Sequence, residues 1–208
     1  ALPILLNGLK KLEYRGYDSA GLSIVENRET VSVKAEGKVS NLEAKTAKIN
    51  TKGTIGIAHT RWATHGKPSE INAHPQFDEK RKVSIVHNGI IENYMDLKEE
   101  MQTHGHNFIS DTDTEVIAHL IDHYFSGDLE IAVLKTVERL SGTFGLAVMH
   151  ADIDNKIIVV KRGSPIVVGI GDNEYFAASD PIAISDYTNK IVVLNDDEMA
   201  ILNQKGYY

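Results

Sequence analysis

Several polar side chains of this sequence are suited to chemistry on a small zwitterionic molecule. Arg61 can hold a carboxylate through two parallel hydrogen bonds, and Asp113 can bind an ammonium group. Asn88 and Gly89 combine a side-chain amide with a backbone N–H, and such donors stabilise the charged oxygen that forms when a carbonyl is attacked. Together these groups describe a pocket for an amino acid whose side-chain carbonyl reacts, although spacing alone does not prove that they converge.

Each of these residues also has a purely structural interpretation. Arg15, at the end of a helix, would interact favourably with the helix dipole. Arg61 is equally compatible with a surface cation beside a packed Trp62. Asn88-Gly89 is the commonest signal for a hairpin turn, and an acid such as Asp113 is favoured in the first turn of a helix. No single segment decides between the functional and the structural interpretation of these residues.

A metal site is a further interpretation, because four histidines fall within thirty residues: His59, His65, His74 and His87. No pair of them has the i, i+4 spacing of a helical zinc site, and there is no cysteine to add a thiolate ligand. We therefore expect no metal. The lack of cysteine also excludes disulfides and thiol catalysis by these residues themselves.

Length and composition indicate one soluble globular domain. The 208 residues are 42% apolar and 25% charged, which is ordinary for a folded domain. The net charge of -7 argues against binding to nucleic acid, which favours a basic surface. No apolar run approaches the roughly 18 residues of a membrane helix, and no signal peptide is recognisable. We therefore expect a cytoplasmic protein that does not bind membranes.

The spacing of apolar residues predicts a mixture of helices and strands. A leucine stripe from Leu2 to Leu12 indicates a helix that ends at Arg15-Gly16. Residues 61–80 lack periodicity and are expected to form a long functional loop. Further helices are expected at 42–49, 93–104, 114–125 (opening with a capping box at 112–115) and 129–140. Strands are expected at 22–25, 30–34, 54–60, 83–87, 144–149, 156–160, 166–170, 174–177, 191–194 and 199–202. Because the late strands follow one another directly, an antiparallel α+β architecture is favoured over a parallel one.

Five segments carry a resemblance to a known family. They are EYRGYDSAG (13–21), HTRWATHG (59–66), NAHP (72–75), HNGIIENY (87–94) and TDTEVIAHL (112–120). From about residue 2 to its end, the chain resembles the glutaminase domain of glucosamine-6-phosphate synthases, which are type 2 glutamine amidotransferases with an N-terminal nucleophile. The amidophosphoribosyltransferase of the purine pathway and asparagine synthetase are related, but the first two segments look closer to the aminosugar enzyme. The resemblance implies a four-layer αββα sandwich with antiparallel sheets over residues 1–208.

The resemblance also implies an activity and roles for individual residues. The activity is hydrolysis of the side-chain amide of L-glutamine to L-glutamate and ammonia. Arg61 should hold the α-carboxylate of the substrate and Asp113 its α-amino group. Asn88, through its side chain, and Gly89, through its backbone N–H, should form the oxyanion hole.

Four further residues have supporting roles by resemblance. Thr64 and His65 should line the glutamine pocket. Arg15 should lie near the nucleophile, and Trp62 resembles the residue that gates the path of ammonia. No metal or organic cofactor is implied. The implied partners are a C-terminal isomerase domain of the same polypeptide, which converts fructose 6-phosphate into glucosamine 6-phosphate, and a second copy in a homodimer.

The nucleophile implied by the resemblance is absent from these 208 residues. In the family an N-terminal Cys attacks the amide carbon, with its own α-amino group as base, and a glutamyl thioester forms and is hydrolysed. A short Gly-rich apolar strand, with its turn about ten residues long, follows that Cys, whereas this sequence opens at the next helix. We expect the 208 residues alone to be inactive. Three explanations stay open: the segment exists outside this sequence, it has been truncated, or the domain only binds glutamine or glutamate as a regulatory module. The glutaminase domain of an amidophosphoribosyltransferase is a further alternative.

Overall fold

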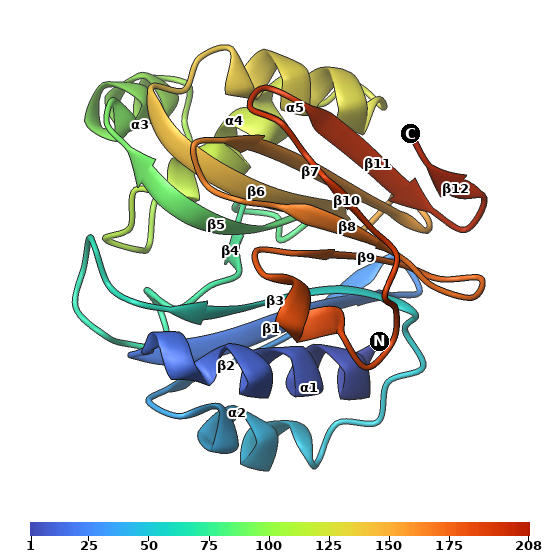
Figure 1. Ribbon diagram of the computed structural model, residues 1–208. Coiled ribbons are helices and arrows are strands. Elements are labelled where there is room, and N and C mark those ends of the chain that lie inside the picture. Colours follow the sequence, from blue (N-terminus) through green and yellow to red (C-terminus); the bar gives the residue numbers. More distant parts are fainter.

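The computed structural model describes residues 1–208, which form four layers of helices and strands (Figure 1). The helices are α1 (Leu2–Leu12), α2 (Val39–Thr46), α3 (Tyr94–Thr103), α4 (Glu115–Tyr124) and α5 (Leu129–Val137), with short 3₁₀ turns η1 (Glu13–Arg15) and η2 (Pro181–Ile184). The strands are β1 (Ser19–Glu26), β2 (Glu29–Glu36), β3 (Ile55–Arg61), β4 (Gln76–Phe77), β5 (Val83–Ile91), β6 (Gly142–His150), β7 (Lys156–Arg162), β8 (Val167–Ile170), β9 (Tyr175–Ala178), β10 (Ile191–Val193), β11 (Met199–Asn203) and β12 (Gly206–Tyr207).

Antiparallel sheets make up the two inner layers. One layer is a six-stranded sheet in the order β12-β11-β7-β6-β5-β4. The other contains two three-stranded sheets, β2-β1-β3 and β10-β8-β9. Val168 of β8 packs toward β7 and β11, whereas the neighbouring Val167 packs toward α1 and η2. The β10-β8-β9 sheet therefore lies in the same layer as β2-β1-β3.

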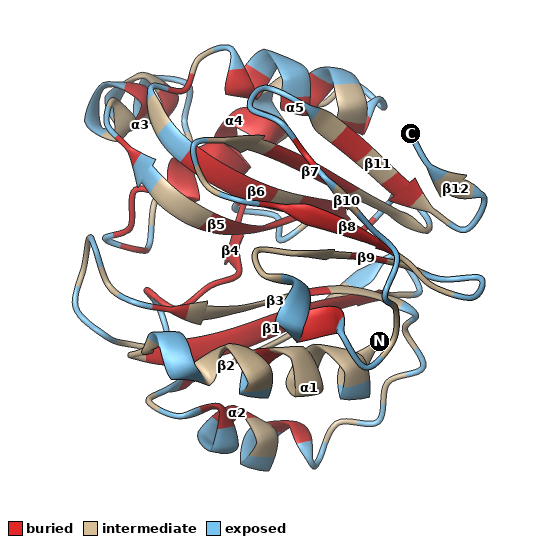
Figure 2. Ribbon diagram, in the orientation of Figure 1, coloured by how far each residue is buried: buried red, intermediate tan, exposed pale blue.

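The outer layers are helical because each sheet must bury its second apolar face. Helices α3, α4 and α5 cover the six-stranded sheet, and α1 and α2 cover β1 and β2. Burial is deepest in the two sheet layers and in α4 (Figure 2). Every residue of α4 from Glu115 to Ile121 is buried. The predicted antiparallel α+β sandwich is confirmed.

Local structure departs from the sequence prediction at several places. Helix α1 ends at Leu12 and continues as the 3₁₀ turn η1, and α2 begins three residues earlier than expected. The loop 61–80 contains the short strand β4. The predicted capping box is wrong: no side chain caps α4, and the Glu115 carboxylate instead accepts hydrogen bonds from the backbone N–H groups of Ile109 and Ser110. That contact fastens the preceding loop to the helix.

The most consequential difference concerns Asn88-Gly89. The dipeptide does not form a turn, because β5 continues through it to Ile91 and stays paired with β6. Gly89 has φ +134°, and a Cβ there would lie 2.0 Å from the backbone oxygen of Thr143. Glycine is therefore required by close strand packing rather than by a hairpin.

Candidate active site

Arg61 ends β3 as a buried cation with unused hydrogen-bonding capacity. Its Nη2 donates to the backbone oxygens of His65 and Gly66, which closes the loop after the strand. Its Nη1 has no hydrogen-bond partner and lies 3.6 Å from Asp18 Oδ1. Only 4% of Arg61 is exposed, and burial lowers its pKa while Asp18 and Asp113 oppose that shift. A buried guanidinium whose N–H has no hydrogen-bond partner is able to bind a carboxylate.

Asp113 lies just before α4, on the same side of the molecule as Arg61. Its Oδ2 accepts a hydrogen bond of 2.8 Å from the backbone N–H of Ile91. Its Oδ1 lies 3.7 Å from Nδ1 of His65, and that nitrogen has no hydrogen-bond partner. The carboxylate is therefore fixed through one oxygen, which leaves the other for a ligand cation.

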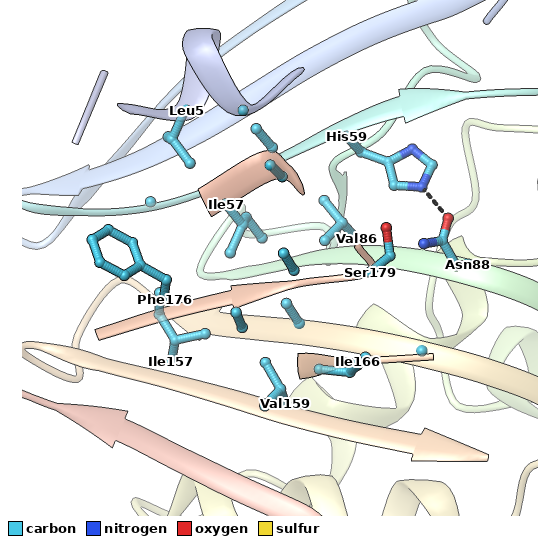
Figure 3. Close-up of a pocket in the computed structure, with 18 of the residues that line it drawn as sticks. Leu5, Ile57, His59, Val86, Asn88, Ile157, Val159, Ile166, Phe176 and Ser179 are labelled. Atoms are coloured by element: carbon cyan, nitrogen blue, oxygen red, sulfur yellow. Dashed lines mark hydrogen bonds between the residues drawn. The ribbon is translucent and has the colours of Figure 1, made fainter. Parts of the chain in front are cut away.

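Asn88 and Gly89 present donors at the free edge of β5. The backbone N–H of His87 donates to His74 Nδ1, and that of Ile91 donates to Asp113. Both N–H groups point away from β6, so the alternation of a strand backbone places the N–H of Gly89 between them on the same edge. The Asn88 side chain accepts a hydrogen bond through Oδ1 from His59 Nε2, at 2.9 Å. Its Nδ2 points away from His59 (Figure 3).

The remaining predicted residues surround this region to different degrees. Arg15 contacts Asp180, Ser179 and Tyr14 at the mouth of the cavity described below. Trp62 is 69% exposed, and its ring lies against Gly16.

Asp18, to which the sequence analysis gave no role, accepts a hydrogen bond from the Ala63 backbone N–H and lies beside Arg61. The only sequence signal for Asp18 is its place in the EYRGYDSAG segment.

One cavity of about 670 Å³ brings most of these side chains together. Its lining includes Arg15, His59, Arg61, Trp62, Thr64, Asn88, Gly89 and Asp113. His65 is not part of the lining, although it contacts both Arg61 and Asp113. The rest of the cavity is apolar and runs between the two sheets, past Ile57, Val86, Ile157, Ile166 and Phe176 (Figure 3).

Three of the four histidines also meet here, but they face separate partners. His59 bonds to Asn88, His74 accepts from the His87 backbone, and the His87 ring contacts Thr114 Oγ1 at 2.9 Å and the Thr143 oxygen at 3.4 Å. No group of three or more His, Cys, Asp or Glu side chains is arranged to hold a metal ion. His59 thus holds the Asn88 side chain, and His74 holds the backbone of the preceding residue, His87.

Comparison with known sequences identifies the family. Residues 19–204 match the model of the glutamine amidotransferase domain. The chain belongs to the glutamine amidotransferase family. The amidotransferase domain is 54% identical over 202 residues to glutamine–fructose-6-phosphate aminotransferase (isomerizing) of Aquifex aeolicus, with 97% of this chain and 34% of that protein covered. It is 51% identical over 210 residues to the enzyme of the same name from Thermococcus kodakarensis, with 100% and 35% covered. The chain thus spans about a third of the length of these curated relatives.

Solved structures support the same family and fold. Glutamine phosphoribosylpyrophosphate amidotransferase from B. subtilis superposes with a TM-score of 0.84 at 25% identity, over 99% of this chain and 45% of that chain. A glutamine aminotransferase class-II domain protein from Silicibacter pomeroyi superposes at 0.64 with 16% identity, over 92% of this chain and 89% of that chain, and shows the shared fold alone. The predicted type 2 amidotransferase fold is confirmed. No helix of the structure is long and apolar enough to cross a membrane.

Proposed function

We propose that the amidotransferase domain takes part in hydrolysis of the side-chain amide of L-glutamine to L-glutamate and ammonia. The observation that carries this proposal is the grouping of opposite charges and neutral donors in one cavity. Arg61, with its unpaired Nη1, binds the α-carboxylate, and Asp113 binds the α-amino group. A substrate held by both charged groups extends its side chain toward Asn88 and Gly89, and Thr64 lines the same cavity.

The chemistry proposed for the site is attack by a thiolate on the amide carbon of glutamine. The carbonyl oxygen takes the negative charge, and Asn88 Nδ2 and the Gly89 N–H stabilise it through hydrogen bonds. The α-amino group of the Cys, which has taken the proton of the thiol, gives that proton to the amide nitrogen as the C–N bond breaks, so that ammonia leaves. Water then hydrolyses the resulting thioester to glutamate. Since the 208 residues contain no cysteine, the thiol comes from a segment outside them.

The apolar part of the cavity is a suitable place for that segment. Consecutive residues of β3, 55–61, and of β9, 175–178, line it. Neighbouring strand residues point to opposite faces of a sheet, so both strands turn an edge rather than a face to the cavity. Each is also the last strand of its sheet, and unpaired edges accept a further strand. We propose that an extended apolar segment beginning with Cys pairs with β3 and β9 and presents its thiol to Asn88.

The proposed strand has a measurable consequence. In the natural full-length protein, those amides of β3 and β9 that face the cavity should be protected from hydrogen exchange, because an added strand accepts their hydrogen bonds. The amides of β3 that donate to β1 serve as the internal reference, since they are paired in either case. Rapid exchange of the cavity-facing amides in the natural protein would argue against the added strand.

The relatives suggest where the ammonia goes. Both are glutamine–fructose-6-phosphate aminotransferases, and this chain covers about a third of each. We propose that the domain supplies ammonia to an isomerase domain of the same polypeptide for synthesis of glucosamine 6-phosphate. The identities of 54% and 51% to these aminotransferases support this choice over the phosphoribosylpyrophosphate amidotransferase, to whose solved structure the chain is 25% identical. Formation of a homodimer remains a prediction that light scattering on the natural protein would test.

Ammonia release by the natural protein tests the proposed activity directly. With L-glutamine as substrate, Asn88→Ala should lower kcat by about 10²- to 10³-fold, the usual loss for one oxyanion-hole donor, with KM nearly unchanged. Calorimetry on the 208-residue chain should detect binding of L-glutamate. Binding of glutamate by a natural protein that releases no ammonia would instead show a regulatory binding module.

A further inference from the structure

The hydrogen bond between His59 and Asn88 raises the question of which way the Asn88 amide faces. An asparagine amide has an oxygen that accepts and a nitrogen that donates, and exchanging the two changes its shape very little. Only one orientation directs the NH₂ group toward the cavity. The other directs the carbonyl oxygen there, where it would repel a developing oxyanion.

The surroundings of His59 favour the orientation in which the NH₂ group of Asn88 faces the cavity. Its Nε2 lies 2.9 Å from Asn88 Oδ1, and its other nitrogen, Nδ1, is buried without any hydrogen-bond partner. A neutral imidazole carries its proton on one nitrogen only. A proton on Nδ1 would be buried and unsatisfied, so the proton resides on Nε2 and is donated to Asn88. An Asn88 amide turned the other way would place an N–H group against this N–H.

The imidazole of His59 is itself held in place. Its ring stacks on His74, with centroids 4.5 Å apart and planes 30° apart. His74 Nδ1 accepts a hydrogen bond from the backbone of His87, the residue before Asn88. Gly21, paired with His59 across β1 and β3, admits the backbone of His74, because a Cβ there would lie 2.2 Å from the His74 oxygen.

His59 is also uncharged at neutral pH. Burial is the main cause that lowers its pKa, to about 4. The neighbouring His87 and Arg61 lower the pKa further, whereas the hydrogen bond to Asn88 and the charge of Asp18 oppose the shift. The stacked His74 is likewise buried, and its pKa lies well below the ordinary value. The imidazole therefore offers a single N–H donor over the physiological range.

We propose that His59 is a positioning residue, whose Nε2–H fixes the Asn88 amide so that Nδ2 faces the reacting carbonyl. The inference rests on the proposed glutamine hydrolysis and adds to it a residue that does not touch the substrate. Arg61 and Asp113 bind glutamine independently of this hydrogen bond. Loss of the donor should therefore affect turnover and leave binding nearly intact.

The test compares two His59 variants in the natural full-length protein. His59→Leu removes the donor, whereas the amide of His59→Gln can still donate to Asn88 Oδ1. His59→Leu should lower kcat at least about tenfold but by no more than the loss in Asn88→Ala, with an unchanged KM. His59→Gln should recover most of that loss. His150→Leu and His150→Gln are matched controls, because His150 is buried against Phe125 and lies opposite Val83 at the start of β5.

Three readouts separate positioning from a structural role. The melting temperature and the affinity for L-glutamate should be similar in both His59 variants, and ¹⁵N NMR of the wild type should show a protonated Nε2 and a bare Nδ1. Wild-type turnover in His59→Leu, or a proton on Nδ1, would overturn the positioning role. So would equal losses of kcat, melting temperature and affinity in both variants. A wild-type protein that releases no ammonia would instead overturn the proposed function itself.

Discussion

At the scale of single residues, unsatisfied polar atoms gather around the proposed glutamine site. Arg61 Nη1, His65 Nδ1 and His59 Nδ1 are all buried without a partner. A buried donor or acceptor without a hydrogen-bond partner lowers the stability of the folded protein by about 1–3 kcal/mol. Such an atom is retained where a bound ligand supplies the missing hydrogen bond. Under the proposed function, a zwitterionic ligand would supply the missing partners of Arg61 and His65. His59 Nδ1 stays unpaired in the proposed tautomer, as a bare acceptor rather than a donor.

Charge at Asp113 should determine affinity rather than turnover. Asp113→Asn retains an oxygen that can accept from the Ile91 N–H but loses the negative charge that faces the α-amino group. A hydrogen bond to a charged group is worth about 1.5–3 kcal/mol, so affinity for L-glutamine should fall about 10- to 150-fold with little change in kcat. Titration calorimetry and steady-state kinetics measure the two effects.

Asp111→Asn is the matched control for Asp113→Asn. Asp111 is exposed, and its carboxylate contacts Asn72 rather than the cavity. Equal affinities of the two variants for glutamine would show that Asp113 does not bind the substrate.

The sequence could predict the charged residues of the site, because the chemistry of a guanidinium or carboxylate limits what it binds. It could not predict the residues that hold the site in place, such as Asp18 and His59. Asp18 reaches the Ala63 backbone across 45 positions, and His59 reaches Asn88 across 29. Such contacts depend on the pairing of β1 with β3 and on the stacking of β3 against β5, which no local pattern contains.

At the scale of elements, strand β5 carries the oxyanion donors by continuing where a turn was the local preference. Asn-Gly favours a hairpin in isolation, yet here its pairing with β6 extends to Ile91. Tertiary pairing overrides the local preference. The regular helices and strands were predicted well because their apolar periodicity is long, whereas the short strand β4 had too few residues to show a period.

Replacing Gly89 should disrupt this part of β5. Gly89→Ala places a Cβ 2.0 Å from the Thr143 oxygen, at φ +134°. The backbone conformation alone costs about 1–3 kcal/mol, and the clash adds to it. Gly105→Ala has a similarly strained φ of +90° but meets no atom within 4 Å. Urea unfolding should show a clearly larger loss of stability for Gly89→Ala, and equal losses would contradict the close packing of β5 and β6.

At the scale of the whole molecule, the sandwich holds an apolar cavity and three histidines between its layers, of which His74 and His87 are buried and His59 is half-buried. The edge strands β3 and β9 of one layer line the same cavity, and the stacking of the two layers brings His59, His74 and His87 together from β3, the following loop and β5. Burial is the main cause that lowers the pKa of all three histidines. The fold therefore maintains them as neutral imidazoles, and protonation opposes folding.

Acid should consequently weaken the fold before carboxylates are protonated. The unfolded chain binds a proton at His59 below about pH 6.5, whereas the folded chain does so only near its lowered pKa of about 4. Stability therefore rises with pH between these values, by at most about 1.4 kcal/mol per pH unit for each such histidine. Burial of Glu115 would raise its pKa, but the hydrogen bonds from the Ile109 and Ser110 backbone N–H groups outweigh that effect and lower the pKa from 4.5. Such carboxylates lose their contribution to stability only at lower pH.

A substitution measures the contribution of His59 to this pH dependence. In His59→Gln this site no longer titrates, so the slope of unfolding free energy against pH should fall by as much as about 1.4 kcal/mol per unit between about pH 4.5 and 6.5. Above about pH 7 the two proteins should differ only by a constant offset, since His59 is neutral in both folded and unfolded chains there. Urea titrations at a series of pH values give both quantities. A slope identical to that of the wild type would mean that His59 is as easily protonated in the folded protein as in the unfolded chain, which is incompatible with the burial of its Nδ1 and the hydrogen bond of its Nε2 to Asn88.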